Sequence, residues 1–325
     1  MLNCGWKFPL LLVEMWWKFP FCGNAIFCIF AALFIKHKSM GSKIDTTLMT
    51  LLNETLHNLE GILNSDVLCY YGPIVDGNEN ALLDIVEDLV ETPEKKDTLT
   101  IILTTNGGSA TAVERYVNII RKHYPKVVFI VPDHAYSAGT IFCMSGDEIW
   151  MDYFSVLGPI DPQVPNKEKR LVPALGYLDK VNELLEKAKT GELTQAEFLI
   201  LKDFDLAELR AYEQAKELTI TLLKKWLVKY KFKNWDVHNS TGNEVTIEEK
   251  EERAEEIANA LSNNKEWKSH GRPINIEELE GLKLKIEDYS DKKDIRNPIR
   301  EYYNMIRDYI AKYNLNIFIH TRKFI

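Results

Sequence analysis

The order of apolar and polar positions predicts alternating strands and helices between residues 66 and 151. Short apolar and β-branched runs, typical of buried strands, occur at 66–71, 99–103, 126–131 and 148–151. Between them, apolar residues recur at helical spacing over 81–90 and from Ala110 onward, and Pro93 and Pro125 end these two helices. Strands that alternate with helices favour a largely parallel sheet, so the predicted fold class is α/β.

The regions on either side of this alternation have helical patterns. One helix is predicted upstream, over residues 44–61. Downstream of Pro173, helices are predicted at 175–189, 195–202, 206–230, 248–261, 276–282 and 298–313. The many charges of 248–261 are typical of a solvated helix face. We therefore expect an α/β core over residues 40–173 and a helical extension with the C-terminal region over 174–325.

Residues 1–39 differ in composition from the rest of the chain. WKFP occurs twice, and a nearly uncharged run over 19–35 is followed by Lys36, His37 and Lys38. A membrane anchor through residues 19–35 is one interpretation, with the catalytic part of the chain in the cytoplasm behind the basic residues. The other is a non-native leader with Met40 as the true start. A secretory signal is disfavoured, because no small-x-small cleavage site follows the apolar run.

Charge and cysteine usage exclude several classes of protein. The 325-residue chain has a formal net charge of −8, which argues against nucleic-acid binding, since that relies on clustered Lys and Arg. The five cysteines have no paired CxxC spacing, so neither a zinc site nor a disulfide framework is predicted. A reduced compartment is the simplest interpretation.

Ser137 is the candidate nucleophile. It follows the strand at 126–131 and precedes Ala138 and Gly139, small residues that let a substrate carbonyl approach a serine hydroxyl. The N-terminus of the helix that follows favours developing negative charge. A serine that only caps this helix is the alternative interpretation. The sequence is not GxSxG, so an α/β-hydrolase is not indicated.

Gly107 and Gly108 are candidate oxyanion-hole residues. They end the strand at 99–103 and leave backbone N–H groups unobstructed, which together with the N–H of Ala138 form a predicted oxyanion hole. Removal of one such donor typically costs on the order of a hundredfold in rate. An ordinary Asn-Gly turn is the alternative interpretation.

Three motifs resemble the serine dehydrogenase proteinase family, a branch of the Clp protease and crotonase-like fold that is related to signal peptide peptidase A. They are TNGG at 105–108, HAYSAGT at 134–140 and GPIDPQ at 158–163. The resemblance extends over roughly residues 43–289 and includes LLKKWL at 222–227 and SHGRPI at 269–274. It implies a spiral of strand-helix units with a helical C-terminal extension, a homo-oligomer, and Ser137 as the nucleophile of a catalytic core over 40–173.

The base that activates Ser137 is harder to assign. Clp proteases use a histidine after the serine, where this chain has Asp161, whereas signal peptide peptidases use a lysine. Such a lysine must be desolvated, so that it is neutral near pH 7. Lys189 stands at the edge of the apolar face of the predicted helix 175–189, at a spacing similar to that of the bacterial peptidase lysine, so we predict a Ser137–Lys189 dyad.

Other bases stay open beside Lys189. A lysine solvated at a helix C-terminus is the alternative interpretation of Lys189 itself. Lys180 and Lys187 point away from the apolar face, and His134 and His270 are the candidate histidines. Asp133 and Asp161 are carboxylates that orient a base or serve only in turns.

These residues predict a serine peptidase that hydrolyses peptide bonds and needs no metal or organic cofactor. Its expected partners are a peptide or protein substrate, further copies of the chain through the helices at 206–230 and 248–261, and a membrane if residues 19–35 form an anchor, but no nucleic acid. Two other functions are open. One is a membrane-associated scaffold or peptide-binding module without a working base, and the other is a crotonase-like enzyme that processes acyl-CoA.

Overall fold

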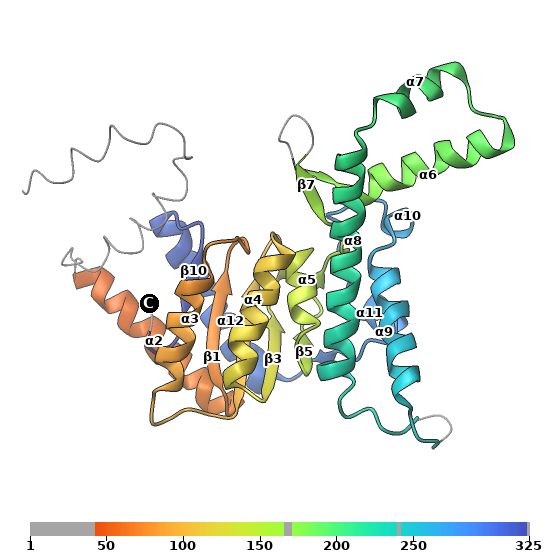
Figure 1. Ribbon diagram of the computed structural model, residues 1–325. Helices are drawn as coiled ribbons and strands as arrows, with labels where there is room; N and C mark the ends of the chain where they lie inside the picture. The colour runs from red at the N-terminus through yellow and green to blue at the C-terminus, as the bar shows by residue number, and fades with distance from the viewer. Residues whose placement is uncertain (1–42, 166–170, 239–241, 324–325) are drawn as a thin grey trace, which may run out of the picture. The chain divides into compact units, whose positions relative to one another are not determined.

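A six-stranded sheet is the centre of the computed structural model, which describes residues 43–165, 171–238 and 242–323. The strand order is β10-β1-β2-β3-β5-β9 (Figure 1). Neighbouring strands from β1 to β9 run parallel, and β10 runs antiparallel to β1. The strands are β1 (Asp66–Tyr71), β2 (Thr98–Thr104), β3 (Lys126–Val131), β5 (Glu148–Met151), β9 (Glu287–Asp288) and β10 (Phe318–His320). The predicted parallel α/β sheet is therefore confirmed.

Helices cover both faces of this sheet. In β2, Leu99, Ile101 and Leu103 point to one face and Ile102 to the other, because side chains alternate along a strand. The first face packs against α3 (Glu79–Val90), α4 (Ala110–His123) and α5 (Ala138–Cys143), which lie along it in Figure 1. The second packs against α2 (Lys43–Leu63) and α12 (Lys293–Tyr313). Burial on both faces explains why the strands are almost continuously apolar.

The helices after residue 173 extend the core beyond the sheet. They are α6 (Ala174–Thr190), α7 (Gln195–Asp203), α8 (Leu206–Trp226), α9 (Ile247–Leu261), α10 (Asn264–Trp267) and α11 (Ile276–Gly281), and a π-helical turn over Leu227–Lys231 follows α8. Leu222 and Trp226 of α8 and Ile257 of α9 are buried in the same cluster as the first sheet face. These parts of the two helices predicted to join copies of the chain therefore pack within the chain itself.

The sheet draws strands from both sides of Pro173, which the helical pattern of the C-terminal region did not predict. β9 and β10 form the two edges of the sheet, and α12 packs on its second face. The described residues from Leu48 onward accordingly form one compact unit. Two small sheets complete the described strands: β4 (His134–Ala135) with β6 (Val156–Leu157), and β7 (Gln163–Pro165) with β8 (Leu171–Pro173).

The anchor interpretation concerns residues 19–35, which lie outside the described residues. Of the helices that the structure does describe, none is both long and apolar enough to cross a bilayer.

A buried ionic cluster ties the segment after β10 to the start of β1. Asp66 is fully buried, and its carboxylate accepts hydrogen bonds from the Tyr124 hydroxyl at 2.8 Å and from Arg322 Nη1 at 2.8 Å. Arg322 also pairs with Glu60 of α2 and donates to Thr92. A buried carboxylate needs such partners, since an unpaired charge in the interior is strongly unfavourable.

Replacement of Arg322 should therefore lower the free energy of unfolding. Arg322→Met leaves the Asp66 and Glu60 carboxylates buried without their cation, so we expect a loss of about 3–5 kcal/mol in the free energy of unfolding. Urea denaturation followed by circular dichroism measures this loss. Lys323→Met is the matched control, because Lys323 is exposed, and it should change stability by no more than about 0.5 kcal/mol. Equal stabilities of the two variants would contradict a role for the cluster.

Candidate active site

Ser137 lies on a strained turn between β4 and α5. Its backbone has φ 50° and ψ −111°, a conformation that non-glycine residues rarely adopt. Hydrogen bonds from Thr105 N–H to His134 O at 3.1 Å and from Tyr136 N–H to Thr105 O at 2.9 Å hold β4 beside the end of β2. The Ser137 side chain makes no capping hydrogen bond to α5, so helix capping does not explain this serine. Backbone strain at a single residue between a strand and a helix is typical of functional sites.

The Gly107–Gly108 loop lies directly against this turn. Gly107 has φ 103°, and a Cβ atom added there would stand 2.9 Å from Ser137 Cβ and 2.8 Å from Tyr136 O. Gly108 has φ 145°, and its added Cβ would stand 1.9 Å from Ile74 O. Only glycine fits either position. The structure therefore brings together Gly107, Gly108 and Ser137, as the sequence analysis expected.

The N–H groups of this loop differ in what they bind. The Gly107 N–H donates to Thr105 Oγ1 at 3.0 Å and is occupied. Gly108 forms a parallel bridge with Ile74, and the two hydrogen bonds of this bridge are made by its neighbours. The Ile74 N–H donates to Gly107 O, and the Ser109 N–H donates to Ile74 O. The N–H of Gly108 itself points away from Ile74, and within the described residues neither it nor the Ala138 N–H donates to a protein acceptor. Of the three N–H groups predicted to form an oxyanion hole, those of Gly108 and Ala138 are thus unbonded within the described residues, whereas that of Gly107 is occupied.

The GPIDPQ turn is hydrogen-bonded to the segment around Ser137. Thr140 Oγ1, fully buried in α5, lies 2.8 Å from both Ala135 O and Gly158 O. The Gly158 N–H donates to Ala135 O at 3.3 Å, and a Cβ added at Gly158 would stand 2.3 Å from Tyr136 Cδ1. The GPIDPQ turn therefore begins in contact with Tyr136, the residue before Ser137.

Asp161 in this turn is an acid buried without full hydrogen bonding. Its side chain is 3% exposed, and Oδ1 accepts the Leu175 N–H of α6 at 3.1 Å. Within the described residues Oδ2 has no hydrogen-bond partner. Burial raises the pKa of Asp161 to about 6, and the neighbouring charge of Asp179 acts in the same direction. Sequence reasoning placed Asp161 in the motif but gave it no more than a role in orienting a base.

The candidate lysines are each paired with a carboxylate of α6 or α7. Lys189 is 70% exposed, and its amino group pairs with Glu186 of the same helix at 2.7 Å. Lys180 pairs with Glu183 at 2.9 Å and Lys187 with Glu197 at 2.6 Å, and the bond to Glu197 raises the pKa of Lys187. Solvent and carboxylates keep an ammonium group charged. The predicted Lys189 base therefore lacks, in this structure, the desolvated setting on which the prediction rested.

The two candidate histidines differ in their surroundings. His134 Nδ1 lies 3.3 Å from Asp133 Oδ1, and its ring stacks on Tyr136 with centroids 5.2 Å apart. The hydrogen bond to His134 lowers the pKa of Asp133, which also accepts the Tyr303 hydroxyl at 3.0 Å. His270 Nδ1, by contrast, is buried without a partner among the described residues, and burial lowers the pKa of its ring.

Cysteine is not a rival nucleophile in the described part of the chain. The thiols of Cys69 and Cys143 are both buried. Burial raises the pKa of Cys69 to about 12 and raises that of Cys143 as well. Both thiols are therefore protonated near pH 7, and only a thiolate is nucleophilic.

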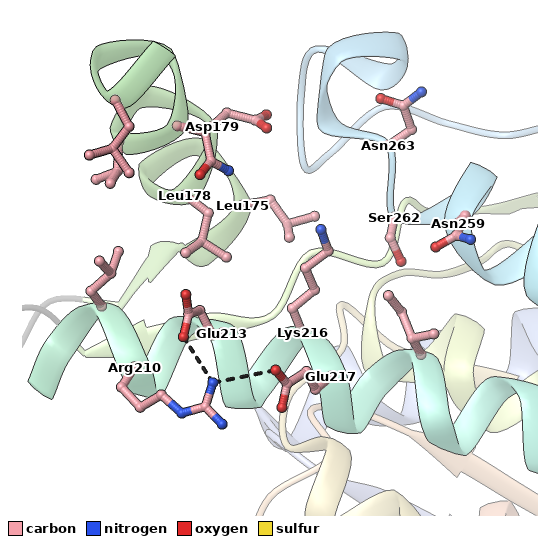
Figure 2. Close-up of a pocket in the computed structure, with 15 residues that line it drawn as sticks. Leu175, Leu178, Asp179, Arg210, Glu213, Lys216, Glu217, Asn259, Ser262 and Asn263 are labelled. Carbon is pink, nitrogen blue, oxygen red and sulfur yellow. Dashed lines mark hydrogen bonds and ion pairs between the residues drawn. The ribbon is translucent and has the colours of Figure 1, made fainter. Parts of the chain in front are cut away.

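A groove of about 560 Å³ opens beside the GPIDPQ turn, between α6, α8 and residues 259–263. It adjoins the turn at two points. The backbone N–H of Leu175, which lines the groove, donates to Asp161. Leu261, which lies between the lining residues Asn259 and Ser262, accepts the Ile160 N–H at 2.9 Å. Figure 2 shows Leu178 of α6 directed toward α8, and Lys216 rising from α8 toward Leu175. The wall combines apolar residues with charges, of which Arg210 pairs with Glu213 and Glu217.

Comparison with known proteins identifies the family. Residues 75–248, more than half of the chain, match the family of ClpP-like SDH-type serine proteinases. The chain belongs to this family. The matched region contains Gly107, Gly108, Ser137, Asp161 and Lys189.

Two similar proteins come from Methanocaldococcus jannaschii. The uncharacterized protein MJ1495 is 29% identical over 203 residues, which cover 62% of this chain and 56% of that protein. The uncharacterized protein MJ0137 is 25% identical over 250 residues, which cover 77% of this chain and 71% of that protein. The chain thus matches little more than half the length of MJ1495.

Solved structures of proteases are also similar. A serine-to-alanine variant of the membrane-bound stomatin-specific protease 1510-N has a TM-score of 0.41 and 14% identity, covering 71% of this chain and 82% of its own. An asparagine-to-aspartate variant of ClpP1 from Listeria monocytogenes has a TM-score of 0.37 and 12% identity, covering 76% and 99%.

The contact between Gly107 and Ser137 predicts a large effect of one added methyl group. Gly107→Ala adds left-handed strain of about 1–2 kcal/mol and a collision with the serine turn that costs about 1–3 kcal/mol more. Urea denaturation of the full chain measures the sum. Gly77→Ala is the matched control, because Gly77 has φ 99° but open space around it, so only the strain remains. Equal losses in the two variants would show that the contact carries no energy.

Proposed function

We propose that the chain is a serine peptidase that cleaves peptide bonds through Ser137. One observation supports this most: a strained, barely exposed serine lies against the glycine loop, and within the described residues the N–H groups of Gly108 and Ala138 have no protein acceptor. Membership of a serine proteinase family supports the same function. Backbone donors fixed before the reaction stabilise a tetrahedral oxyanion without reorganisation, which is usually the largest single contribution to such catalysis.

In the proposed reaction, Ser137 Oγ attacks the carbonyl carbon of the scissile bond and loses its proton to a base. The developing oxyanion accepts hydrogen bonds from the N–H groups of Gly108 and Ala138. The base returns the proton to the leaving amine, the C–N bond breaks, and water then hydrolyses the acyl-enzyme. A Ser137–Lys189 dyad requires the Lys189 ammonium to leave Glu186 and become neutral in an apolar setting.

We place the substrate chain in the groove between α6 and α8. Leu175 and Leu178 give it an apolar wall, and its edge contacts the turn that carries Asp161. Extended peptides with apolar side chains fit such a surface, because burial of each apolar side chain contributes favourably to binding.

The other functions and partners make different predictions. An acyl-CoA enzyme would bind coenzyme A thioesters without cleaving peptides, and a scaffold would bind peptides independently of Ser137. The homo-oligomer remains a prediction that sedimentation velocity of the full chain can test. Among the surfaces left for it is α7, which has no buried residue and exposes Phe198, Leu199 and Ile200.

Substitution of the serine tests the peptidase directly. Ser137→Ala removes the nucleophile, so we expect it to abolish both labelling by a fluorophosphonate probe and cleavage of casein. Ser109→Ala is the control: Ser109 accepts the Ala112 N–H as an N-cap, so its loss lowers stability by about 1 kcal/mol and leaves labelling in place. If Ser137→Ala labels and cleaves as wild type does, the proposed function is wrong.

A charge in the groove should affect peptides but not small probes. Leu178→Glu places a carboxylate on the apolar wall, and we expect it to raise KM for an apolar fluorogenic peptide by about tenfold or more, the equivalent of about 1.4 kcal/mol of binding energy. The rate of fluorophosphonate labelling should stay within about twofold, because that probe does not fill the groove. Leu199→Glu, on exposed α7, is the control. An unchanged KM for Leu178→Glu would remove the groove from the substrate site.

A further inference from the structure

We propose that Thr105 is a positioning residue for the reaction at Ser137, because it holds the oxyanion donors of Gly108 and Ala138 at a fixed place beside the serine. This role rests on the peptidase function proposed above. Thr105 directly follows β2 and is 2% exposed. It therefore acts through the protein groups that it contacts, which lie in three different segments of the site.

The backbone of Thr105 holds the segment that leads to Ser137. Thr105 forms a parallel bridge with Ala135. Its N–H donates to His134 O at 3.1 Å, and its carbonyl oxygen accepts the Tyr136 N–H at 2.9 Å. Tyr136 directly precedes Ser137. The second of these bonds thus fixes a peptide group one residue away from the nucleophile.

The side-chain hydroxyl of Thr105 holds the glycine loop. Its Oγ1 accepts the Gly107 N–H at 3.0 Å and lies 3.4 Å from Gly107 O. A threonine hydroxyl bonded to the backbone two residues further on makes a compact turn. Two successive glycines have wide backbone freedom, so a loop of this kind needs such a bond to keep one conformation. The next N–H along the chain is that of Gly108, and its direction follows from this turn.

The methyl group of Thr105 packs on the first turn of α5. A Cβ atom added at Gly139 would stand 2.3 Å from Thr105 Cγ2. Gly139 follows Ala138, whose N–H is the second unbonded donor, and the Gly139 N–H donates to Tyr136 O at 2.8 Å. The distance between α5 and the end of β2 is therefore set by contact between the Thr105 methyl group and Gly139.

The two segments that carry the donors are themselves in contact. A Cβ added at Gly107 would stand 3.3 Å from the backbone nitrogen of Ala138. Donors of an oxyanion hole must meet the oxyanion at hydrogen-bond distance, and a misplacement of about 1 Å can cost about 100-fold in rate. Thr105 contacts the glycine loop through its hydroxyl and α5 through its methyl group, so it determines the spacing of the two donors.

Substitution of the hydroxyl tests this role in the full chain. Thr105→Val keeps the branched shape and leaves the Gly107 N–H without its acceptor. We expect it to lower kcat for peptide hydrolysis and the fluorophosphonate labelling rate at least about tenfold, with KM unchanged, because the oxyanion forms only after substrate binds. Thr105→Ser keeps the hydroxyl, and it should recover both rates to within about threefold of wild type.

Thr100→Val is the matched control for a loss of stability. Thr100 is buried in the same strand, and its Oγ1 lies 2.6 Å from Ser65 Oγ. The control thus removes a buried threonine hydrogen bond at the opposite end of β2. Urea denaturation should show a lower stability for both valine variants, whereas kcat of Thr100→Val should stay within about twofold of wild type. If Thr105→Val does not fold, Thr105→Ala compared with Thr105→Ser isolates the same hydroxyl, since both lack the methyl group.

A second substitution tests the methyl contact from the side of α5. Gly139 lies in helical backbone, so Gly139→Ala adds no left-handed strain, and its methyl group collides with Thr105 Cγ2. We expect kcat to fall about tenfold through the displaced donor. The double variant Gly139→Ala/Thr105→Ser removes the colliding group and should return kcat to within about threefold of Thr105→Ser alone.

The outcomes separate this role from the peptidase function. A wild-type kcat in Thr105→Val, while Ser137→Ala does not label, overturns the role of Thr105 and leaves the peptidase in place. Equal losses of kcat in the valine and serine variants at 105, or in the valine variants at 100 and 105, overturn it as well. A double variant as slow as Gly139→Ala removes the methyl contact from the role. Labelling that does not depend on Ser137 overturns the proposed function itself.

Discussion

The close approach of the Gly107–Gly108 loop to Ser137 is the constraint on which the rest of the site depends. The parallel strands β2 and β3 end at the same edge of the sheet, and the chain leaves each of them through a turn. Those turns touch so closely that a side chain at Gly107 would overlap Ser137. Left-handed backbone at Ser137 is maintained because the sheet, Ile74 and Thr105 hold both turns from outside. Strain at Ser137 is thus supported by ordinary sheet hydrogen bonding.

Local patterns in the sequence predicted the parts of this arrangement that are local in the chain. The strands at 66–71, 126–131 and 148–151 have the same bounds in the structure, because each is an apolar run that ends at turn residues. The glycine loop and Ser137 were predicted as site residues on similar grounds. Each lies at the end of a strand, where α/β folds place binding and catalytic groups.

The remaining features depend on contacts between distant residues, which periodicity does not encode. β9 has two residues and β10 three, too short to give a pattern, and they are strands only because β5 and β1 offer free edges. The exposure of Lys189 depends on where α6 ends relative to the core, so a helical wheel that showed it at the edge of an apolar face was insufficient. The occupied N–H of Gly107 likewise became apparent only with Thr105 in place.

The buried polar groups of the described residues are of two kinds: groups whose hydrogen bonds are complete, and groups with an atom that has no partner. The Asp66 carboxylate is fully bonded by Tyr124 and Arg322, so its burial fixes the fold. Asp161 Oδ2 and His270 Nδ1, by contrast, are buried atoms without a hydrogen-bond partner among the described residues. Selection for stability alone would fill or remove such atoms, because each lowers the free energy of unfolding. Retention of such an atom on Asp161, in the turn that packs against Tyr136, is therefore a feature that stability does not explain.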